Sequence, residues 1–167
     1  MSGRALVPEP LTKAAFAPFG DVIETVGCET RVINQGFALR RHDLARVEVG
    51  DGGRTCVSIF EAKQRPRPIA IDMLEKHPLA SQAFYPLQPH DWLVVVAEGG
   101  DAPDLSTLRC FRATGAQGVN YAPGVWHFPV LTIAETQSFF IVDREGAAPN
   151  LVERFFETDE ITSILSD

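Results

Sequence analysis

The chain has 167 residues, of which 45% are apolar, and it carries a formal net charge of −7. This length supports one well-buried core but is short for two, so we predict a single domain over residues 1–167. The acidic balance, with no basic stripe, argues against a nucleic-acid partner. The longest apolar run, 92–97, is too short to cross a bilayer, and the first residues lack a signal-peptide pattern. We therefore expect a cytoplasmic protein with no membrane partner.

Short β-branched or aromatic runs, bounded by Gly, Pro or Asp, predict strands along the whole chain. In chain order they cover 21–24, 37–43, 46–49, 55–60, 69–75, 81–85, 92–97, 107–112, 118–121, 128–133, 137–142 and 151–156. Helix is sparse: Thr12 is placed to cap a short turn through Phe16, and Thr158 to cap a terminal helix. Residues 50–53 read as a hairpin turn between two strands, and 98–104 as a solvent loop. The pattern predicts a mainly β sandwich or barrel with few short helices.

The three cysteines, Cys28, Cys56 and Cys110, cannot all pair within the chain and show no C-x-x-C spacing. Cys56 and Cys110 lie inside strand-like runs. We expect small buried apolar side chains in a reducing compartment rather than catalytic or metal-binding thiols.

Two segments place side chains that bind metals or move protons among strand-like apolar residues. The first has the form Glu75-x-His77-x4-Gln82, and the second is Pro123-Gly124-Val125-Trp126-His127. They resemble, in weakened form, the two motifs of cupin β-barrels, H-x-H-x4-E and P-x-G-x-x-H. Glu75 and Gln82 stand where that pattern has His and Glu, and one residue is missing between Pro and Gly. A cupin-like β-barrel of the double-stranded β-helix type is the fold that the likeness implies.

Alternation along 69–77, taken as one strand, puts Glu75 and His77 on one face with Ile71 and Met73. Gln82 would reach the same cavity from the following strand. Each side chain also has a plain structural interpretation. Glu75 can be a solvated strand-edge charge, and either histidine can simply be hydrogen-bonded, His77 at the turn made by Pro78. The Pro-Gly turn before His127 favours an inward direction for that imidazole.

Further short segments narrow the resemblance to one family. They are Ile33-Asn34-Gln35-Gly36, Arg41-His42-Asp43-Leu44-Ala45, Leu74-Glu75-Lys76-His77-Pro78, Ser81-Gln82-Ala83-Phe84, Pro103-Asp104-Leu105-Ser106-Thr107-Leu108, Gly118-Val119-Asn120-Tyr121, Trp126-His127 and Val142-Asp143-Arg144. Their order and spacing, over nearly the whole chain, resemble the ureidoglycolate lyase family. The resemblance implies a cupin-like homodimer that splits ureidoglycolate into glyoxylate and urea in allantoin breakdown.

Loss of urea from this substrate requires a base at the hydroxyl, an acid at the departing nitrogen, and a cation or backbone amides at the carboxylate. His127 and His77, supported by Glu75, are the predicted proton carriers. Gln82 is expected to orient the ureido group of the substrate through its amide, or to replace a ligand carboxylate. The same residues with Gln82 offer a mixed nitrogen and oxygen set for a divalent ion. The family resemblance suggests nickel, but the set does not demand a metal.

Other assignments stay more open. Arg40, Arg41, Arg112 and Arg144 are all candidates to bind the substrate carboxylate, and the sequence does not choose among them. Alternation puts Arg40 and His42 on one face, so Arg40 is expected at the pocket, with a surface or dimer ion pair as its alternative. Tyr121 and Trp126 are expected to wall the pocket or else to pack in the core. A sheet edge formed by the first or last strand is the expected dimer contact.

Alternative functions are a different small-molecule enzyme on the same barrel, and a non-catalytic module that binds a small carboxylate. The enzyme would be an amidohydrolase that releases ammonia from ureidoglycolate or a metal-dependent isomerase.

Overall fold

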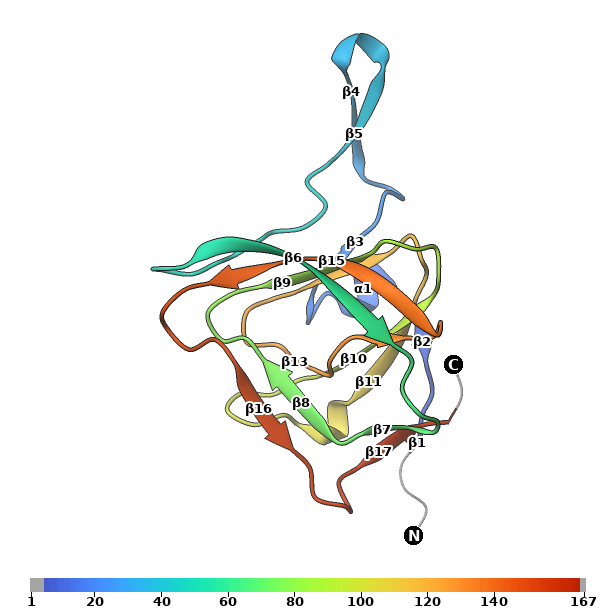
Figure 1. Ribbon diagram of the computed structural model, residues 1–167, viewed down its shortest axis with the longest axis vertical. Coiled ribbons are helices and arrows are strands. Elements are labelled where there is room, and N and C mark those ends of the chain that lie inside the picture. The colour runs from blue at the N-terminus through green and yellow to red at the C-terminus, as the bar shows by residue number, and fades with distance from the viewer. Residues whose placement is uncertain (1–4, 166–167) are drawn as a thin grey trace.

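The protein is built mainly of strands, as a computed structural model that describes residues 5–165 shows (Figure 1). The helical elements are α1 (Lys13–Phe16) and the 3-10 turns η1 (Asn34–Gly36) and η2 (Leu105–Thr107). The strands are β1 (Ala5–Leu6), β2 (Glu9–Pro10), β3 (Gly20–Ile23), β4 (Glu29–Ile33), β5 (Ala38–His42), β6 (Arg54–Lys63), β7 (Ile69–Ile71), β8 (Met73–Lys76), β9 (Gln82–Pro86), β10 (Trp92–Ala97), β11 (Arg109–Ala113), β12 (Gly118–Tyr121), β13 (Trp126–His127), β14 (Leu131–Thr132), β15 (Thr136–Glu145), β16 (Val152–Phe155) and β17 (Thr162–Ile164). Across residues 5–165, no helix has the length and apolar character that a membrane span requires.

Two sheets hold the centre of the molecule. A seven-stranded sheet has the order β16-β8-β13-β10-β11-β2, with β14 also on β10, and a five-stranded sheet has the order β3-β12-β9-β15-β6. The pairings are nested: β10 pairs with β11, β9 with β12, and β8 with β13. The first and last pairs belong to one sheet and the middle pair to the other. An antiparallel ribbon therefore winds from sheet to sheet, which is the cupin-like double-stranded β-helix expected from the sequence.

The two sheets face each other, but among the described strands no ladder joins them into a closed barrel. The five-stranded sheet ends at β6, and the seven-stranded sheet ends at β16. The chain passes from β15 in one sheet to β16 in the other, and this connection spans the open side of the molecule (Figure 1). The barrel is thus open at the free edge of β16.

The core has two parts because β10 is covered on both faces. Trp92, Val94 and Val96 pack between the two large sheets, where Phe139 and Ile141 are also fully buried. Leu93, Val95 and Ala97 point the other way, into a second cluster that the small sheet β1-β17-β7 covers. A strand covered on both faces explains the continuous apolar run at 92–97.

Cys110 lies in the second of these clusters, and burial raises the pKa of its thiol to about 12. A thiol so reluctant to ionise is inert, which agrees with the structural role expected for it.

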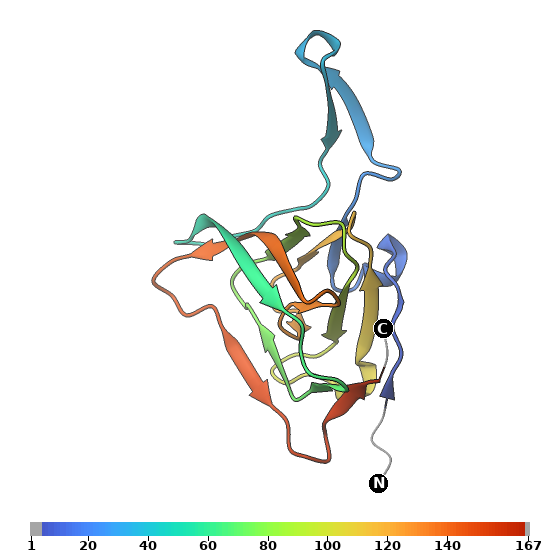
Figure 2. The ribbon, with the colours of Figure 1, turned by 45° about the vertical axis from the view of Figure 1, so that its right-hand side comes forward.

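A two-stranded hairpin, β4 and β5 joined by η1, projects from the body, and we call residues 29–42 the arm (Figures 1 and 2). Its two strands pair only with each other, from Glu29 opposite His42 to Ile33 opposite Ala38. The sequence predicted the second strand and missed the first.

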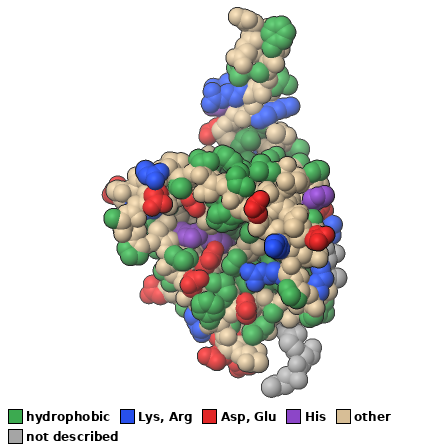
Figure 3. Space-filling view, viewed as in Figure 1, with side chains coloured by type: hydrophobic (Ala, Val, Ile, Leu, Met, Phe, Trp, Pro, Cys, Tyr) green, Lys and Arg blue, Asp and Glu red, His purple; other side chains and the backbone are tan. Residues whose placement is uncertain are grey.

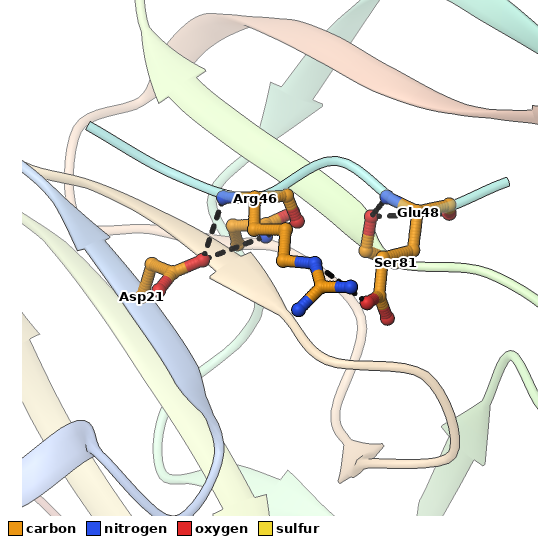
Figure 4. A network of polar contacts seen from close by, with 5 residues as sticks. Asp21, Arg46, Glu48 and Ser81 are labelled. Atoms are coloured by element: carbon orange, nitrogen blue, oxygen red, sulfur yellow. Dashed lines mark hydrogen bonds and ion pairs between the residues drawn. The ribbon is translucent and has the colours of Figure 1, made fainter. Parts of the chain in front are cut away.

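The chain that returns from the arm is fastened to the outer face of the five-stranded sheet (Figure 4). Asp21 accepts a hydrogen bond from the backbone N–H of Arg46 at 3.0 Å, and Ser81 exchanges hydrogen bonds with the backbone of Glu48. Asn120, which is 1% exposed, donates to both Asp21 and the Arg46 carbonyl. Side chains therefore replace a backbone ladder here, and the strand predicted at 46–49 is absent.

Several other local predictions can be compared with the structure. Thr12 caps α1, where its hydroxyl accepts from the Ala15 N–H, as expected. The terminal helix after Thr158 is wrong, because 162–164 form β17 between β1 and β7. Residues 50–53 close no hairpin, since β6 pairs with the distant β15. The run at 69–77 breaks at Asp72 into β7 and β8, which enter different sheets.

We predict that Asn120→Ala destabilises the fold, because it removes the buried amide that donates to both Asp21 and the Arg46 carbonyl. The free energy of unfolding should fall by about 1–3 kcal/mol in chemical denaturation. Glu61→Ala, a change at an exposed position of β6, serves as the control and should stay within about 0.5 kcal/mol of the parent. Equal stability of Asn120→Ala and the parent would contradict the fastening described above.

Candidate active site

Glu75, His77 and His127 come together inside the open barrel. One oxygen or nitrogen atom from each lies within 4.8 Å of the others. Glu75 stands on β8 and His77 follows its last residue, while His127 ends β13. The ladder between these strands sets His127 directly opposite Glu75, so both side chains leave the same face of the sheet. The convergence predicted for these three side chains is found.

A second backbone contact fixes the approach to His127. Gly124 donates its N–H to the carbonyl of His77 at 2.8 Å, and Val125 donates to Ala122 to close a turn. Gly124 has a φ of +79°, a conformation that glycine adopts without steric cost. The Pro-Gly turn thus ties the segment before His127 to the end of β8.

Both imidazoles are held through Nδ1. The His127 Nδ1 lies 2.9 Å from the Val125 carbonyl, and the His77 Nδ1 lies 2.7 Å from the Asn150 carbonyl. A carbonyl oxygen only accepts, so each Nδ1 must carry the hydrogen and donate it. In the neutral rings Nε2 then bears a lone pair, and in both rings this atom is buried with no hydrogen-bond partner among the described residues.

The Glu75 carboxylate faces these lone pairs, with Oε1 at 3.5 Å from the His127 Nε2. Burial favours the neutral acid, but the hydrogen bond and positive charge that His127 supplies when its Nε2 is protonated, with the charges of protonated His77 and of Arg65, outweigh it. The pKa of Glu75 is therefore lowered, and the group is a carboxylate at neutral pH.

Two buried Nε2 lone pairs beside a carboxylate fit a divalent cation. Without a cation, a neutral imidazole has no hydrogen on Nε2 to donate to Glu75, so its lone pair faces the carboxylate directly. Histidine ligands typically donate their second ring N–H to a carbonyl, as both do here. Two imidazoles and one carboxylate leave further coordination positions open for a substrate. The residues thus suit a metal of the kind that the sequence allowed.

Tyr121 and Gln82 complete the inner wall. The Tyr121 ring stacks on the His127 ring with centroids 4.1 Å apart and planes 11° from parallel. Burial, with the charge of Glu75, raises the Tyr121 pKa, so its hydroxyl stays protonated. Gln82 stands opposite Tyr121 in the ladder of β9 and β12, so it faces the same interior. It donates through Nε2 to Asp143 at 3.3 Å.

Asp143 was not selected from the sequence as a site residue. It follows Phe139 and Ile141 on the inner face of β15, where alternation carries it to the rim of the cavity. A pocket of about 360 Å³ opens there, between His77 and the connection from Asp143 to Leu151. Extending the predicted strand 137–142 by one residue would have found it.

Trp126 is not at the site. It neighbours His127 on β13, so its side chain leaves the opposite face and packs in the outer core cluster. Its Nε1 donates to the Gly100 carbonyl, and Lys76 lies over its ring. The core alternative left open in the sequence is therefore the correct one for Trp126.

The arginine predictions are also corrected. Arg40 stands on β5 in the arm, away from the cluster, because the strand that carries it pairs only within the arm (Figure 2). Arg41 binds Thr30 in the arm, and Arg112 pairs with Asp91. Arg144 donates to the backbone carbonyls of Val49 and Asp51.

Arg65, in the loop after β6, is instead the arginine whose charge lowers the pKa of Glu75. Its guanidinium lies over the Phe128 ring, 4.6 Å from the centroid. No pattern around Arg65 distinguishes it in the sequence, because a loop carries it and only the fold brings it near β8.

Comparison with known proteins gives one consistent family. Residues 3–163 match the family model described as ureidoglycolate lyase. The ureidoglycolate lyase of Azotobacter vinelandii is 52% identical over 158 residues, which cover 94% of this chain and 95% of that protein. The ureidoglycolate lyase of Stutzerimonas stutzeri is 53% identical over 158 residues, covering 94% and 93%. An oxalate decarboxylase structure from Lactobacillus farciminis covers 64% of this chain and 32% of that one, with 14% identity and a TM-score of 0.39, too slight a likeness to support an argument.

We predict that the metal-free protein binds one Ni²⁺ ion per chain in isothermal titration calorimetry. His77→Ala and His127→Ala should each weaken this binding at least tenfold, since each removes a nitrogen ligand. His90→Ala is the matched control and should bind as the parent does, because His90 lies in a surface loop. The metal site would be contradicted if titration of the parent with nickel gave no heat of binding, or if all variants bound nickel equally.

Proposed function

Because the chain belongs to the ureidoglycolate lyase family, we propose that it cleaves ureidoglycolate into glyoxylate and urea. The observation that carries this proposal is the convergence of two buried Nε2 atoms and one carboxylate next to a pocket that His77 lines. The reaction needs such a set: the hydroxyl loses its proton as the carbon–oxygen double bond forms, and the carbon–nitrogen bond breaks with its electron pair going to nitrogen. That nitrogen then takes a proton and leaves as urea, so no water is consumed.

In this proposal His127 and His77 accept the hydroxyl proton and return it to the departing nitrogen. An imidazole with a free lone pair at Nε2 accepts the hydroxyl proton, and the Glu75 carboxylate beside it stabilises the imidazolium. The Val125 and Asn150 carbonyls hold each ring in the required tautomer, while Tyr121 fixes the ring plane of His127. The proton is then available for the departing nitrogen.

In a second form of the proposal, a divalent ion, nickel being our choice from the family likeness, would be held by the two Nε2 atoms and Glu75, and these lone pairs would then bind the ion and not accept the hydroxyl proton. When bound, it would supply Lewis acidity that acidifies a hydroxyl group next to a carboxylate. The chain's own residues would still orient the substrate around it.

In this proposal Asp143 and Gln82 orient one end of the substrate, and Arg65 orients the other. Asp143 presents a carboxylate that can accept both N–H groups of a ureido unit, in the fork geometry familiar from guanidinium pairs. Gln82 lies beside it and offers an amide to the same group. Arg65 is our candidate for the substrate carboxylate, since its positive charge already acts on Glu75. Two finer expectations belong to this proposal, a homodimeric state and a cytoplasmic location, the latter in keeping with three free thiols.

The test is a urea-release assay with ureidoglycolate. His127→Ala and His77→Ala should each lower kcat/KM roughly a hundredfold or more, because each removes a proton acceptor or a ligand. His90→Ala again serves as the control. Release of ammonia in place of urea would favour the amidohydrolase alternative, and binding of glyoxylate without turnover would favour the non-catalytic one.

Asp143→Asn should raise KM for ureidoglycolate roughly tenfold or more, with a smaller change in kcat, because a charged acceptor for the ureido N–H groups is lost. Asp101→Asn is the matched control, since Asp101 is an exposed carboxylate in the loop after β10. Steady-state urea release measures both constants. An unchanged KM in Asp143→Asn would remove Asp143 from substrate recognition.

A further inference from the structure

His77 and His127 are held in the same tautomer by different means. The carbonyl that accepts from the His127 Nδ1 belongs to Val125, two residues earlier in the same turn, and the Tyr121 ring stacks on the imidazole. His127 is also 1% exposed, so packing fixes its ring. The carbonyl that accepts from the His77 Nδ1 belongs to Asn150, 73 residues further along the chain. The tautomer of His77 therefore depends on how a distant segment is placed.

His77 stands where the molecule is open. It is only half-buried, and it lines the pocket of about 360 Å³ that the connection from β15 to β16 borders. On this side, histidine and acidic side chains are visible next to one another at the surface (Figure 3). Residues 145–149 of the connection are themselves exposed. The His77 ring therefore relies on its hydrogen bond for a fixed orientation more than the His127 ring does.

Pro78 explains why the Asn150 carbonyl meets a side chain and not the backbone. The antiparallel register of β16 and β8 sets Val152 opposite Lys76. Two residues beyond, the same register puts Asn150 opposite Pro78. Proline has no N–H, so a backbone ladder has no donor for the Asn150 carbonyl at this point. The Nδ1 of His77 takes that place, at 2.7 Å from the oxygen.

The side chain of Asn150 closes the other half of the contact. Its Oδ1 accepts the N–H of Leu79 at 2.8 Å. A backbone N–H only donates, so the amide atom that faces Leu79 must be the oxygen, which fixes the orientation of the amide. One residue thus binds the segment 77–79 twice, through its carbonyl at the His77 ring and through its side chain beyond Pro78. The second bond holds the carbonyl in place.

We propose that Asn150 is a positioning residue for His77. Its side-chain bond to Leu79 keeps the Asn150 carbonyl on Nδ1, so the Nε2 lone pair stays directed at the cluster that His77 forms with Glu75 and His127. This role rests on the proposed function, and it serves both forms of that proposal. Accepting the hydroxyl proton and binding a divalent ion both need an Nε2 without hydrogen.

The first experiment reads the tautomers directly, in the metal-free chain without substrate. Long-range proton–nitrogen correlation NMR of isotope-labelled imidazoles, at a pH where both rings are neutral, distinguishes a nitrogen that carries hydrogen from one that does not. In the parent, Nδ1 should carry the hydrogen in both rings. In Asn150→Ala, His77 should become a mixture of tautomers while His127 stays unchanged. Asn150→Asp keeps an oxygen for the Leu79 N–H and should keep the parent tautomer.

Steady-state urea release gives the second readout. Asn150→Ala should lower kcat roughly tenfold or more, with KM within about threefold of the parent, because the groups that bind substrate stay in place. Asn150→Asp should recover most of kcat. Thr107→Ala is the matched control. The Thr107 hydroxyl accepts the Glu98 N–H at 2.9 Å, in a loop that contributes nothing to the cluster or to the pocket that His77 lines. This variant loses an equivalent bond and should keep the parent kcat and both tautomers.

Melting curves check that each variant is folded. Should Asn150→Ala fail to fold, Asn150→Ser, whose hydroxyl is one atom shorter than the amide, carries the same prediction. A parent in which the His77 Nδ1 bears no hydrogen would overturn the positioning role with no variant involved. An unchanged His77 tautomer in the folded variant, or equal effects of Thr107→Ala, would overturn it as well. The tautomer readout involves no catalysis, so an inactive parent with the expected spectra would refute the proposed activity alone.

Discussion

The ladder between β8 and β13 is the contact on which the site depends. It sets His127 opposite Glu75, and the hydrogen bond from Gly124 to the His77 carbonyl extends it past the end of β8. The three clustered side chains are therefore placed by backbone pairing between distant segments, not by contacts among themselves. Side-chain packing in the core would not place these three residues so closely, because packing fixes distances far less narrowly than a strand register does.

Because β10 is buried on both faces, neighbouring side chains of its partner β13 enter different surroundings. Val96 pairs with His127 and Ala97 with Trp126, and these pairs point to opposite faces of the sheet. One face meets the interior between the two large sheets, and the other meets the small sheet. An imidazole and an indole that are neighbours in sequence thus have unrelated surroundings: His127 lies beside Glu75 and Tyr121, and Trp126 lies in an apolar cluster.

The sequence was sufficient where local pattern and fold agree. Alternation and turn residues predicted most strands of the two large sheets, and the spacing of Glu75, His77 and His127 anticipated their convergence. It failed where partners are distant in sequence. Thr158 has the features of a helix cap, yet β1 and β7 draw the following residues into a strand. Arg40 has the alternation of an inward residue, but its strand pairs with β4, whose exposed sequence gives no strand signal.

The fastening of the returning chain has a consequence for association. Asp21, at the last strand before the arm, also binds the backbone of Arg46 just after it, so both roots of the arm are anchored on one sheet (Figure 4). A projection with two anchored roots has few orientations left to lose when it meets a surface. The conformational entropy of the hairpin is thus largely lost during folding. Because the direction of the arm is already fixed, contact with another surface would cost little further ordering entropy.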